Sequence, residues 1–235
     1  MTQNDLFLQW LSEEQAAYIH GWDFSHIQDR YEECQSLPWD YGQAVHDLLR
    51  PTHRILDMDT GGGEFLLSLG HPHSLTAATE GYPPNIALCR KVLLPLGIDF
   101  RGADGGGPLP FPDESFDLVL NRHGDYLPSE ILRVLKPGGI FVTQQVGAEN
   151  DRDLVELLLN PAPPLPFPEQ YLDIARKKLE FLGLRILKAQ ESFQPIRFRD
   201  TGALVWFARI IAWEFPGFSV EACREQLLNA RSEER

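Results

Sequence analysis

One short run of the chain, RILDMDTGGGE at residues 54–64, constrains the fold more than any other. A buried-strand pattern ends at Asp57, glycines occupy positions 61–63, and an amphipathic stretch covers residues 64–69. Glycines let backbone amides approach a ligand without a Cβ in the way, and the start of a helix adds partial positive charge. The run therefore predicts a strand, a tight turn and a helix, with the ligand site at residues 57–64.

Three kinds of nucleotide-type ligand use such a turn. A phosphate-binding loop requires Gly-Lys-Ser or Gly-Lys-Thr, whereas Glu64 follows Gly63 here, and a carboxylate at that place repels a triphosphate. The dinucleotide fingerprint requires a third glycine where Leu66 stands, which weakens the NAD interpretation without excluding it. S-adenosylmethionine (SAM) carries no phosphate, and its ammonium group favours a carboxylate such as that of Asp57. The turn alone does not decide among these ligands.

Four further segments follow the turn in a regular order. LTAATE (75–80) has the pattern of a second strand ending in an acid, and IDFRGAD (98–104) has the pattern of a third. LPFPDESFDLVL (109–120) leads through a proline-rich turn into a fourth strand. RVLKPGG (133–139) ends a helix with a Pro-Gly-Gly turn and enters a strand at 140–146. Strands that alternate with helices predict a parallel sheet joined by right-handed crossovers.

Together these segments resemble the class I SAM-dependent methyltransferases over residues 52–147, most specifically in the combination of 109–120 with 133–139. The resemblance implies an α/β fold, with a Rossmann-like, doubly wound, mostly parallel sheet and helices on both faces. It also implies SAM as cofactor, S-adenosylhomocysteine as product, and methyl transfer by in-line displacement.

The resemblance also implies which residues hold the cofactor. It places Asp57 near the methionine amino group and makes Gly61 and Gly63 the second and third glycines of the turn. Asp59 stands where the family has its first glycine. Asp tolerates unusual backbone angles, but its carboxylate is expected to weaken cofactor binding unless it points at the ammonium or at an amide. The remaining cofactor contacts are Thr60 in the turn, Glu80 at the ribose hydroxyls, Gly81 beside the adenine, Ala103 and Asp104 at the adenine ring, and Asn121 beside the transferable methyl.

Two residues that follow the fourth strand are predicted to act on the substrate, because Rossmann-like sheets place substrate-facing groups at the carboxyl ends of their strands. His123 is predicted as a general base or a hydrogen-bond partner of the substrate, and a structural histidine is the alternative. Arg122 is predicted either to anchor an acidic substrate or to pair with Asp125 or Glu130. NRHG (121–124) replaces the Asn-Pro-Pro-Tyr tetrad of many enzymes that methylate amides or base-ring amines.

Composition bears on the acceptor. A net charge of −13 over 235 residues is repelled by a phosphate backbone, since nucleic-acid binders usually present a basic face. We therefore expect a small-molecule acceptor, with a methyltransferase acting on RNA or protein, or a non-enzymatic SAM-binding module, as alternatives. Three separated cysteines without a C-x-x-C pair predict a reducing cytoplasm and no metal. No run approaches the ~20 apolar residues of a membrane span, so no membrane association is expected.

The pattern predicts two parts, a helical N-terminal cap at 1–50 and a methyltransferase domain at 51–235. The cap is rich in aromatic residues, which either pack against the core or, through SLPWDY (36–41), close over cofactor and substrate. The domain is expected to include a helix at 169–182 and a strand at 184–193.

Residues 200–230 are predicted as a helical addition on the substrate side, with one helix capped by Asp200 and another at 219–230. A strand at 204–213 is the competing prediction. Because this fold usually closes its sheet with an antiparallel strand, we expect either residues 203–213 to serve as that strand or the natural chain to continue past Arg235. A monomer and a homodimer are both compatible with the sequence.

Overall fold

The computed structural model describes residues 2–18, 24–33 and 36–232, and it divides the chain into two compact units. Unit 1 combines Met1–Pro38, Gly147–Glu169 and Glu191–Arg235, and unit 2 combines Trp39–Val146 and Gln170–Gln190. The predicted boundary at residue 50 therefore does not coincide with the boundary between the units. Trp22 of the predicted cap, and Cys34, lie outside the described residues.

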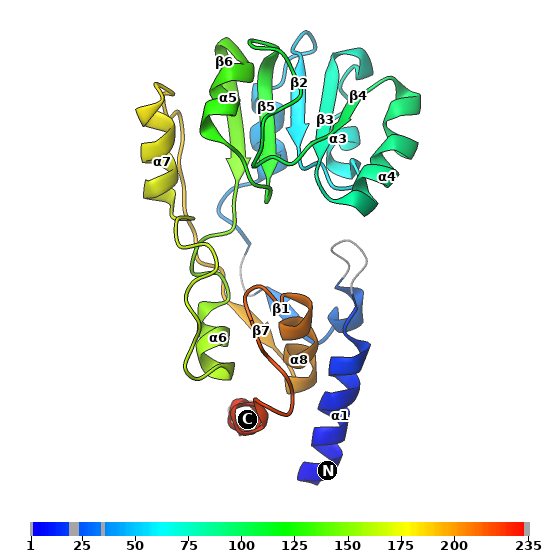
Figure 1. Cartoon of the computed structure of the whole chain (residues 1–235), viewed down its shortest axis with the longest axis vertical. Coiled ribbons are helices and arrows are strands. Elements are labelled where there is room, and N and C mark those ends of the chain that lie inside the picture. The colour runs from blue at the N-terminus through cyan, green and yellow to red at the C-terminus, as the bar shows by residue number, and fades with distance from the viewer. Residues whose placement is uncertain (1, 19–23, 34–35, 233–235) are drawn as a thin grey trace. The chain divides into compact units, whose positions relative to one another are not determined.

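Unit 2 is built on a sheet of five parallel strands in the order β4-β3-β2-β5-β6 (Figure 1). The strands are β2 (Ile55–Met58), β3 (Thr76–Glu80), β4 (Asp99–Gly102), β5 (Phe116–Arg122) and β6 (Leu135–Gln144). The helices of this unit are α2 (Tyr41–Leu48), α3 (Glu64–Ser68), α4 (Pro83–Val92), α5 (Pro128–Val134) and α7 (Leu172–Phe181), with short 3-10 turns at His73–Leu75 and Leu94–Leu96.

Helices cover both faces of this sheet, and the strands are apolar for that reason. Ile55 of β2 packs in one cluster with residues of α2, α3 and α4, whereas its neighbour Leu56 packs in another with residues of α5. Successive strand residues point to opposite faces, so a strand buried on both sides reads as a continuous apolar run. The predicted Rossmann-like α/β fold is confirmed.

Two predictions about this sheet need correction. The Pro-Gly-Gly turn does not precede the last strand but lies within β6, where the pairing with β5 shifts register between Phe116 and Leu118. The strand predicted at 184–193 is wrong, because these residues form no ladder. Their alternating pattern suits a strand, but a strand also needs a partner, and the chain pairs a later segment instead.

Unit 1 gathers pieces from three distant parts of the sequence. It contains the strands β1 (Tyr31–Glu33) and β7 (Ile196–Phe198), paired antiparallel, and the helices α1 (Gln3–Ala16), α6 (Arg152–Leu158), α8 (Thr201–Ile210) and α9 (Arg224–Ser232), with a 3-10 turn at Ser25–Ile27. The residues described hold no helix long and apolar enough to cross a membrane.

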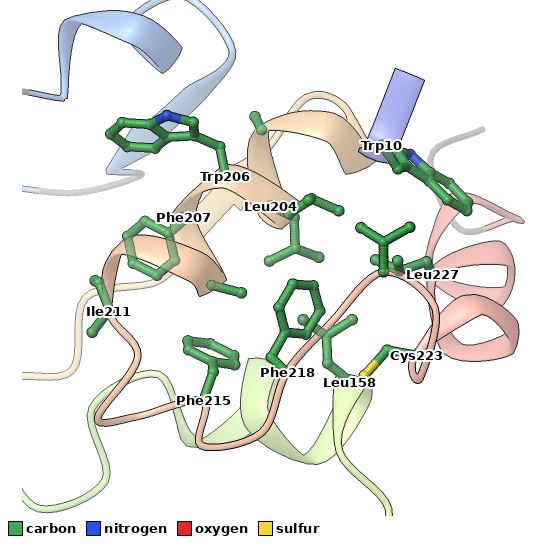
Figure 2. Packing of buried hydrophobic residues seen from close by; sticks show 14 of the residues in the cluster. Trp10, Leu158, Leu204, Trp206, Phe207, Ile211, Phe215, Phe218, Cys223 and Leu227 are labelled. Atoms are coloured by element: carbon green, nitrogen blue, oxygen red, sulfur yellow. The ribbon is translucent and has the colours of Figure 1, made fainter. Parts of the chain in front are cut away.

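Helix α8 forms the centre of the unit 1 core. It buries every residue from Thr201 to Ala208, and Figure 2 shows Phe215 and Phe218 below the helix. The prediction that Asp200 caps the N-terminus of this helix is confirmed, since the Asp200 carboxylate accepts a hydrogen bond from the Ala203 N–H at 2.9 Å. The competing strand at 204–213 is thus wrong, and these residues do not close the sheet of unit 2. The second predicted helix begins later than expected, at Arg224.

An ion-pair network explains why the N-terminal residues belong with the C-terminal ones. Arg30 pairs with Glu13 of α1 at 2.7 Å and with Asp200, at the start of α8, at 2.6 Å. Trp10 of α1 is 1% exposed and lies in the same apolar cluster as α8. The apolar side of α1 is therefore covered inside unit 1, which is why the predicted cap at 1–50 divides after residue 38.

Candidate active site

The glycine turn follows the central strand β2. Asp59, Gly61 and Gly63 all adopt positive φ, at 51°, 64° and 87°. Asp59 thus takes the left-handed conformation expected of the glycine that it replaces. A Cβ on Gly63 would lie 2.8 Å from the Leu93 side chain, whereas a Cβ on Gly61 would meet nothing within 4 Å. The turn is therefore tightly packed at Gly63, where α3 begins, and has free space beside Gly61.

Glu80, at the end of β3, holds the turn in place. Its carboxylate accepts the Gly61 N–H at 2.7 Å through one oxygen and the Tyr82 N–H at 2.8 Å through the other. The side chain is 5% exposed. The Cys89 thiol of α4 adds a hydrogen bond to the Gly61 carbonyl at 3.0 Å. Each Glu80 oxygen has a second lone pair, so the carboxylate can still accept from two hydroxyls.

Asp57 is buried at the end of β2, directly beside the turn. It accepts a hydrogen bond from the Thr60 hydroxyl at 2.6 Å. Burial raises the pKa of Asp57 to about 7, the hydrogen bond from Thr60 opposes that rise, and the charge of Glu80 adds to it. A nearby cation would reverse this shift, because an opposite charge stabilises the ionised carboxylate.

Asp59 is wedged between two glycines of neighbouring loops. A Cβ on Gly105 or on Gly124 would collide with its side chain. Burial first, and then the surrounding acids beginning with Glu80, raise the pKa of Asp59 to about 7. Within the described ranges, the Asp59 carboxylate accepts no hydrogen bond from an amide. The described part of the chain holds no group of three or more His, Cys, Asp or Glu that could bind a metal ion.

The residues predicted at the adenine meet at the ends of β3 and β4. The Ala103 N–H donates to the Glu80 carbonyl at 3.0 Å. A Cβ on Gly81 would lie 3.1 Å from the Asp104 Cα, so the two backbones are in close approach. Asp104 itself is exposed and accepts the Gly106 N–H at 2.9 Å. Next to Gly81, the Tyr82 side chain is 61% exposed.

Asn121 occupies the end of β5 and is fully buried. Its amide oxygen accepts a hydrogen bond from the Gln145 side chain at 2.5 Å, and its amide nitrogen donates to the Asp125 carbonyl at 3.4 Å. Asn121 also stands opposite Met58 in the register of β2 and β5, which places it beside the start of the turn. Its contacts support the loop that carries the next two predicted residues.

Arg122 is the last residue of β5 and His123 follows it, and their side chains have different surroundings. The Arg122 guanidinium lies over the Tyr41 ring, 5.7 Å from its centroid. The predicted pairing of Arg122 with Asp125 or Glu130 is not present among the described residues, and Glu130 pairs with Arg133 at 2.6 Å instead. His123 has a φ of 61° and an exposed side chain. Partial desolvation and the charge of Arg122 lower the pKa of His123.

Two residues beside His123 were not predicted as site residues. Gln144, the last residue of β6, is hydrogen-bonded to His123 at 3.2 Å and accepts the Trp39 indole N–H at 2.9 Å. Gln144 could have been predicted as a site residue from the sequence, because polar residues end an otherwise apolar strand at this position. Trp39 belongs to SLPWDY (36–41), of which residues 36–38 lie in unit 1 and residues 39–41 in unit 2. Its hydrogen bond to Gln144 places Trp39 at the carboxyl end of β6.

A parallel sheet of this order, with a glycine turn after its central strand and acids ending β2 and β3, defines a Rossmann-like domain of the class I methyltransferase type. Residues 56–143 match the family model described as a methyltransferase domain. Over this stretch the chain is similar to the class I SAM-dependent methyltransferases.

Individual proteins agree with this assignment. The chain is 36% identical over 98 residues to a phthiotriol/phenolphthiotriol dimycocerosates methyltransferase of Mycobacterium tuberculosis, covering 39% of this chain and 36% of the relative. It is 30% identical over 142 residues to a 2-methyl-6-phytyl-1,4-hydroquinone methyltransferase of Synechocystis, covering 56% of this chain and 40% of the relative. The chain thus spans well under half the length of either relative.

A solved structure from Bacillus halodurans resembles the chain over a longer stretch. It has a TM-score of 0.55 at 18% identity and covers 80% of this chain and 82% of that one. At this identity the likeness concerns the fold alone.

Proposed function

We propose that the protein is a SAM-dependent methyltransferase that moves a methyl group from SAM to a small-molecule acceptor by in-line displacement. The observation that carries the proposal is the open glycine turn at Gly61, held by the buried carboxylate of Glu80 and flanked by Asp57. These residues fit SAM, because the turn leaves space at Gly61 and Glu80 keeps acceptor capacity for ribose hydroxyls.

The residues proposed to bind the cofactor follow the order of the strands. Asp57 would hold the methionine ammonium, and Glu80 the ribose hydroxyls. Thr60, Gly61 and Gly63 would shape the turn, with Gly81, Ala103 and Asp104 at the adenine and Asn121 near the methyl. When bound, SAM supplies a methyl group on a positively charged sulfur, which is an excellent leaving group.

The protein's own contribution is to align the acceptor atom with that methyl group. Proximity and orientation are worth up to ~7–11 kcal/mol of the barrier. A base is needed only when the acceptor carries a proton that must leave first. Arg122 and His123, which lie at the carboxyl end of β5, are proposed to contact the acceptor.

Two observations favour a small acceptor. The edge that carries the turn is acidic, with Asp57, Asp59, Glu80, Asp104 and Asp125 close enough to influence one another's charge. Such an edge repels a nucleic-acid backbone. The two relatives are named for methylating a dimycocerosate and a hydroquinone, and neither name is that of a polymer.

The cofactor can be tested without knowing the acceptor. We expect calorimetric titration of the protein with S-adenosylhomocysteine to give one site per chain with micromolar affinity, and titration with NAD to give no heat of binding. Binding of NAD alone would replace the proposal with a dinucleotide enzyme. Absence of S-adenosylhomocysteine binding by the folded protein would reduce it to a statement about fold.

A substitution at His123 tests the acceptor side. We expect His123→Ala to lower kcat by roughly a hundredfold, a typical loss when a side chain that donates a hydrogen bond or moves a proton at the reacting group is removed, while the affinity for S-adenosylhomocysteine stays the same. The measurement is steady-state turnover on an acceptor found by screening small molecules with SAM. His46→Ala, at an exposed histidine of α2, is the matched control. Unchanged turnover in His123→Ala would remove His123 from the mechanism.

A further inference from the structure

We propose that Trp39 and Gln144 hold the His123 ring neutral with its proton on Nδ1, so that His123 offers the acceptor a hydrogen-bond donor and not a general base. The role toward the acceptor rests on the proposed function. The proton position itself does not, and it can be measured separately.

The argument begins at Trp39, whose indole N–H can only donate a hydrogen bond. It lies 2.9 Å from Oε1 of Gln144. The opposite orientation of the Gln144 amide would turn its NH2 group toward the indole N–H, and two donors would face each other. Trp39 therefore fixes the Gln144 amide with its oxygen toward the indole.

The fixed amide then determines the protonation of His123. With its oxygen directed at Trp39, Gln144 turns its NH2 group toward Nε2 of His123 at 3.2 Å. Because that NH2 group can only donate, Nε2 must accept and cannot carry a proton. A neutral imidazole has one N–H, which must then be on Nδ1.

Two further features keep the ring in this state. The His123 backbone N–H donates to the Gln144 carbonyl at 2.9 Å, so both the main chain and the side chain of His123 are hydrogen-bonded to Gln144. Partial desolvation and the charge of Arg122 lower the pKa of His123, and both effects disfavour a second proton. In the described part of the chain, Nδ1 has no hydrogen-bond partner, so its N–H is free to donate.

The consequence concerns the kind of acceptor. The lone pair of Nε2 is engaged by Gln144, so His123 does not take a proton from the nucleophile. The acceptor forms its new bond to the methyl carbon with its own lone pair, while the electrons of the breaking carbon–sulfur bond go to sulfur. Any proton leaves to solvent. The Nδ1–H group suits an acceptor that presents an oxygen lone pair, such as a carbonyl or a phenolate.

The test is the tautomer of His123, measured by two-dimensional 15N NMR of histidine-labelled protein, with the signal assigned by its loss in His123→Ala. We expect the Nδ1–H form to predominate at pH 7.5, although a free neutral histidine favours the opposite form. Gln144→Glu replaces the donor by an acceptor, and we expect it to move the proton to Nε2 and to lower kcat by about tenfold with unchanged affinity for S-adenosylhomocysteine. Gln43→Glu, at an exposed position of α2, is the control that leaves the tautomer unchanged.

A second variant guards against misfolding of the first. Trp39→Phe removes the N–H that orients the amide, and we expect it to give a mixture of both tautomers. Nε2–H as the major form of the wild type, or a tautomer unaffected in a folded Gln144→Glu or Trp39→Phe protein, would overturn the proposal. Loss of the proposed function would appear instead as missing cofactor binding in the wild type.

Discussion

Glu80→Ala is expected to weaken binding of S-adenosylhomocysteine by about a hundredfold or more. The Glu80 carboxylate is the shared acceptor for the Gly61 and Tyr82 amides at 2.7 and 2.8 Å. Loss of these hydrogen bonds would leave the turn less well ordered for binding. The two proposed charge-assisted hydrogen bonds from the ribose hydroxyls contribute roughly 1.5–3 kcal/mol each, so their joint loss corresponds to two orders of magnitude in affinity or more.

The measurement is calorimetric titration of each variant, with circular dichroism to confirm that the sheet has folded. Glu80→Gln keeps an acceptor oxygen but loses the charge, and we expect an intermediate affinity. Glu156→Ala, at a largely exposed residue of α6 in the other unit, should bind as the wild type does. Wild-type affinity in a folded Glu80→Ala protein would mean that the cofactor binds elsewhere.

Asp59→Asn is expected to raise the melting temperature of the ligand-free protein by roughly 3–6 °C at pH 8 and to leave it nearly unchanged at pH 4. The pKa of Asp59 is raised to about 7 by burial and by the neighbouring acids. Ionising this carboxylate in the folded protein is therefore unfavourable. Asn has the same shape and tolerates the left-handed backbone of this position, so the substitution removes mainly the charge.

The sign of the pH effect follows from proton binding. Between the unfolded pKa, near 3.8, and the folded pKa, about 7, the folded protein holds more protons than the unfolded chain. Stability contributed by Asp59 is thus present at low pH and is lost as the pH rises toward 7. Asp57, Asp151 and Glu214 have raised pKa values as well, so the wild type should lose stability over this range for several reasons.

Melting curves of wild type and Asp59→Asn from pH 4 to pH 8 isolate the contribution of Asp59 as the difference between the two. Asp113→Asn, at an exposed carboxylate with a side-chain exposure of 75%, controls for the loss of one charge. We also expect tighter binding of S-adenosylhomocysteine by Asp59→Asn, since a carboxylate near the cofactor's own carboxylate is removed. A difference in melting temperature that does not change with pH would contradict the assigned pKa.

The sequence alone determined the sheet and the cofactor side of the site. Apolar runs buried on both faces predicted β2, β3 and β5 within a few residues, and an acid marks the ends of β2 and β3. The turn at Gly61 and Gly63 and the acid Glu80 were identified from the same local patterns. These features are readable because each depends on neighbours in the chain: strand periodicity, glycine conformations and the place where a strand ends.

Only the tertiary structure decided the rest. The division into two units depends on the ion pairs of Arg30 with both Glu13 and Asp200. Arg30 and Asp200 are 170 positions apart in the sequence. The neighbours of His123 come from β6 and from the segment before α2, and no local pattern links them. The segment at 184–193 has the alternation of a strand and still forms none. Strand pairing and side-chain hydrogen bonds depend on which distant segments come into contact in the fold. The periodicity of side chains along the sequence does not determine those contacts.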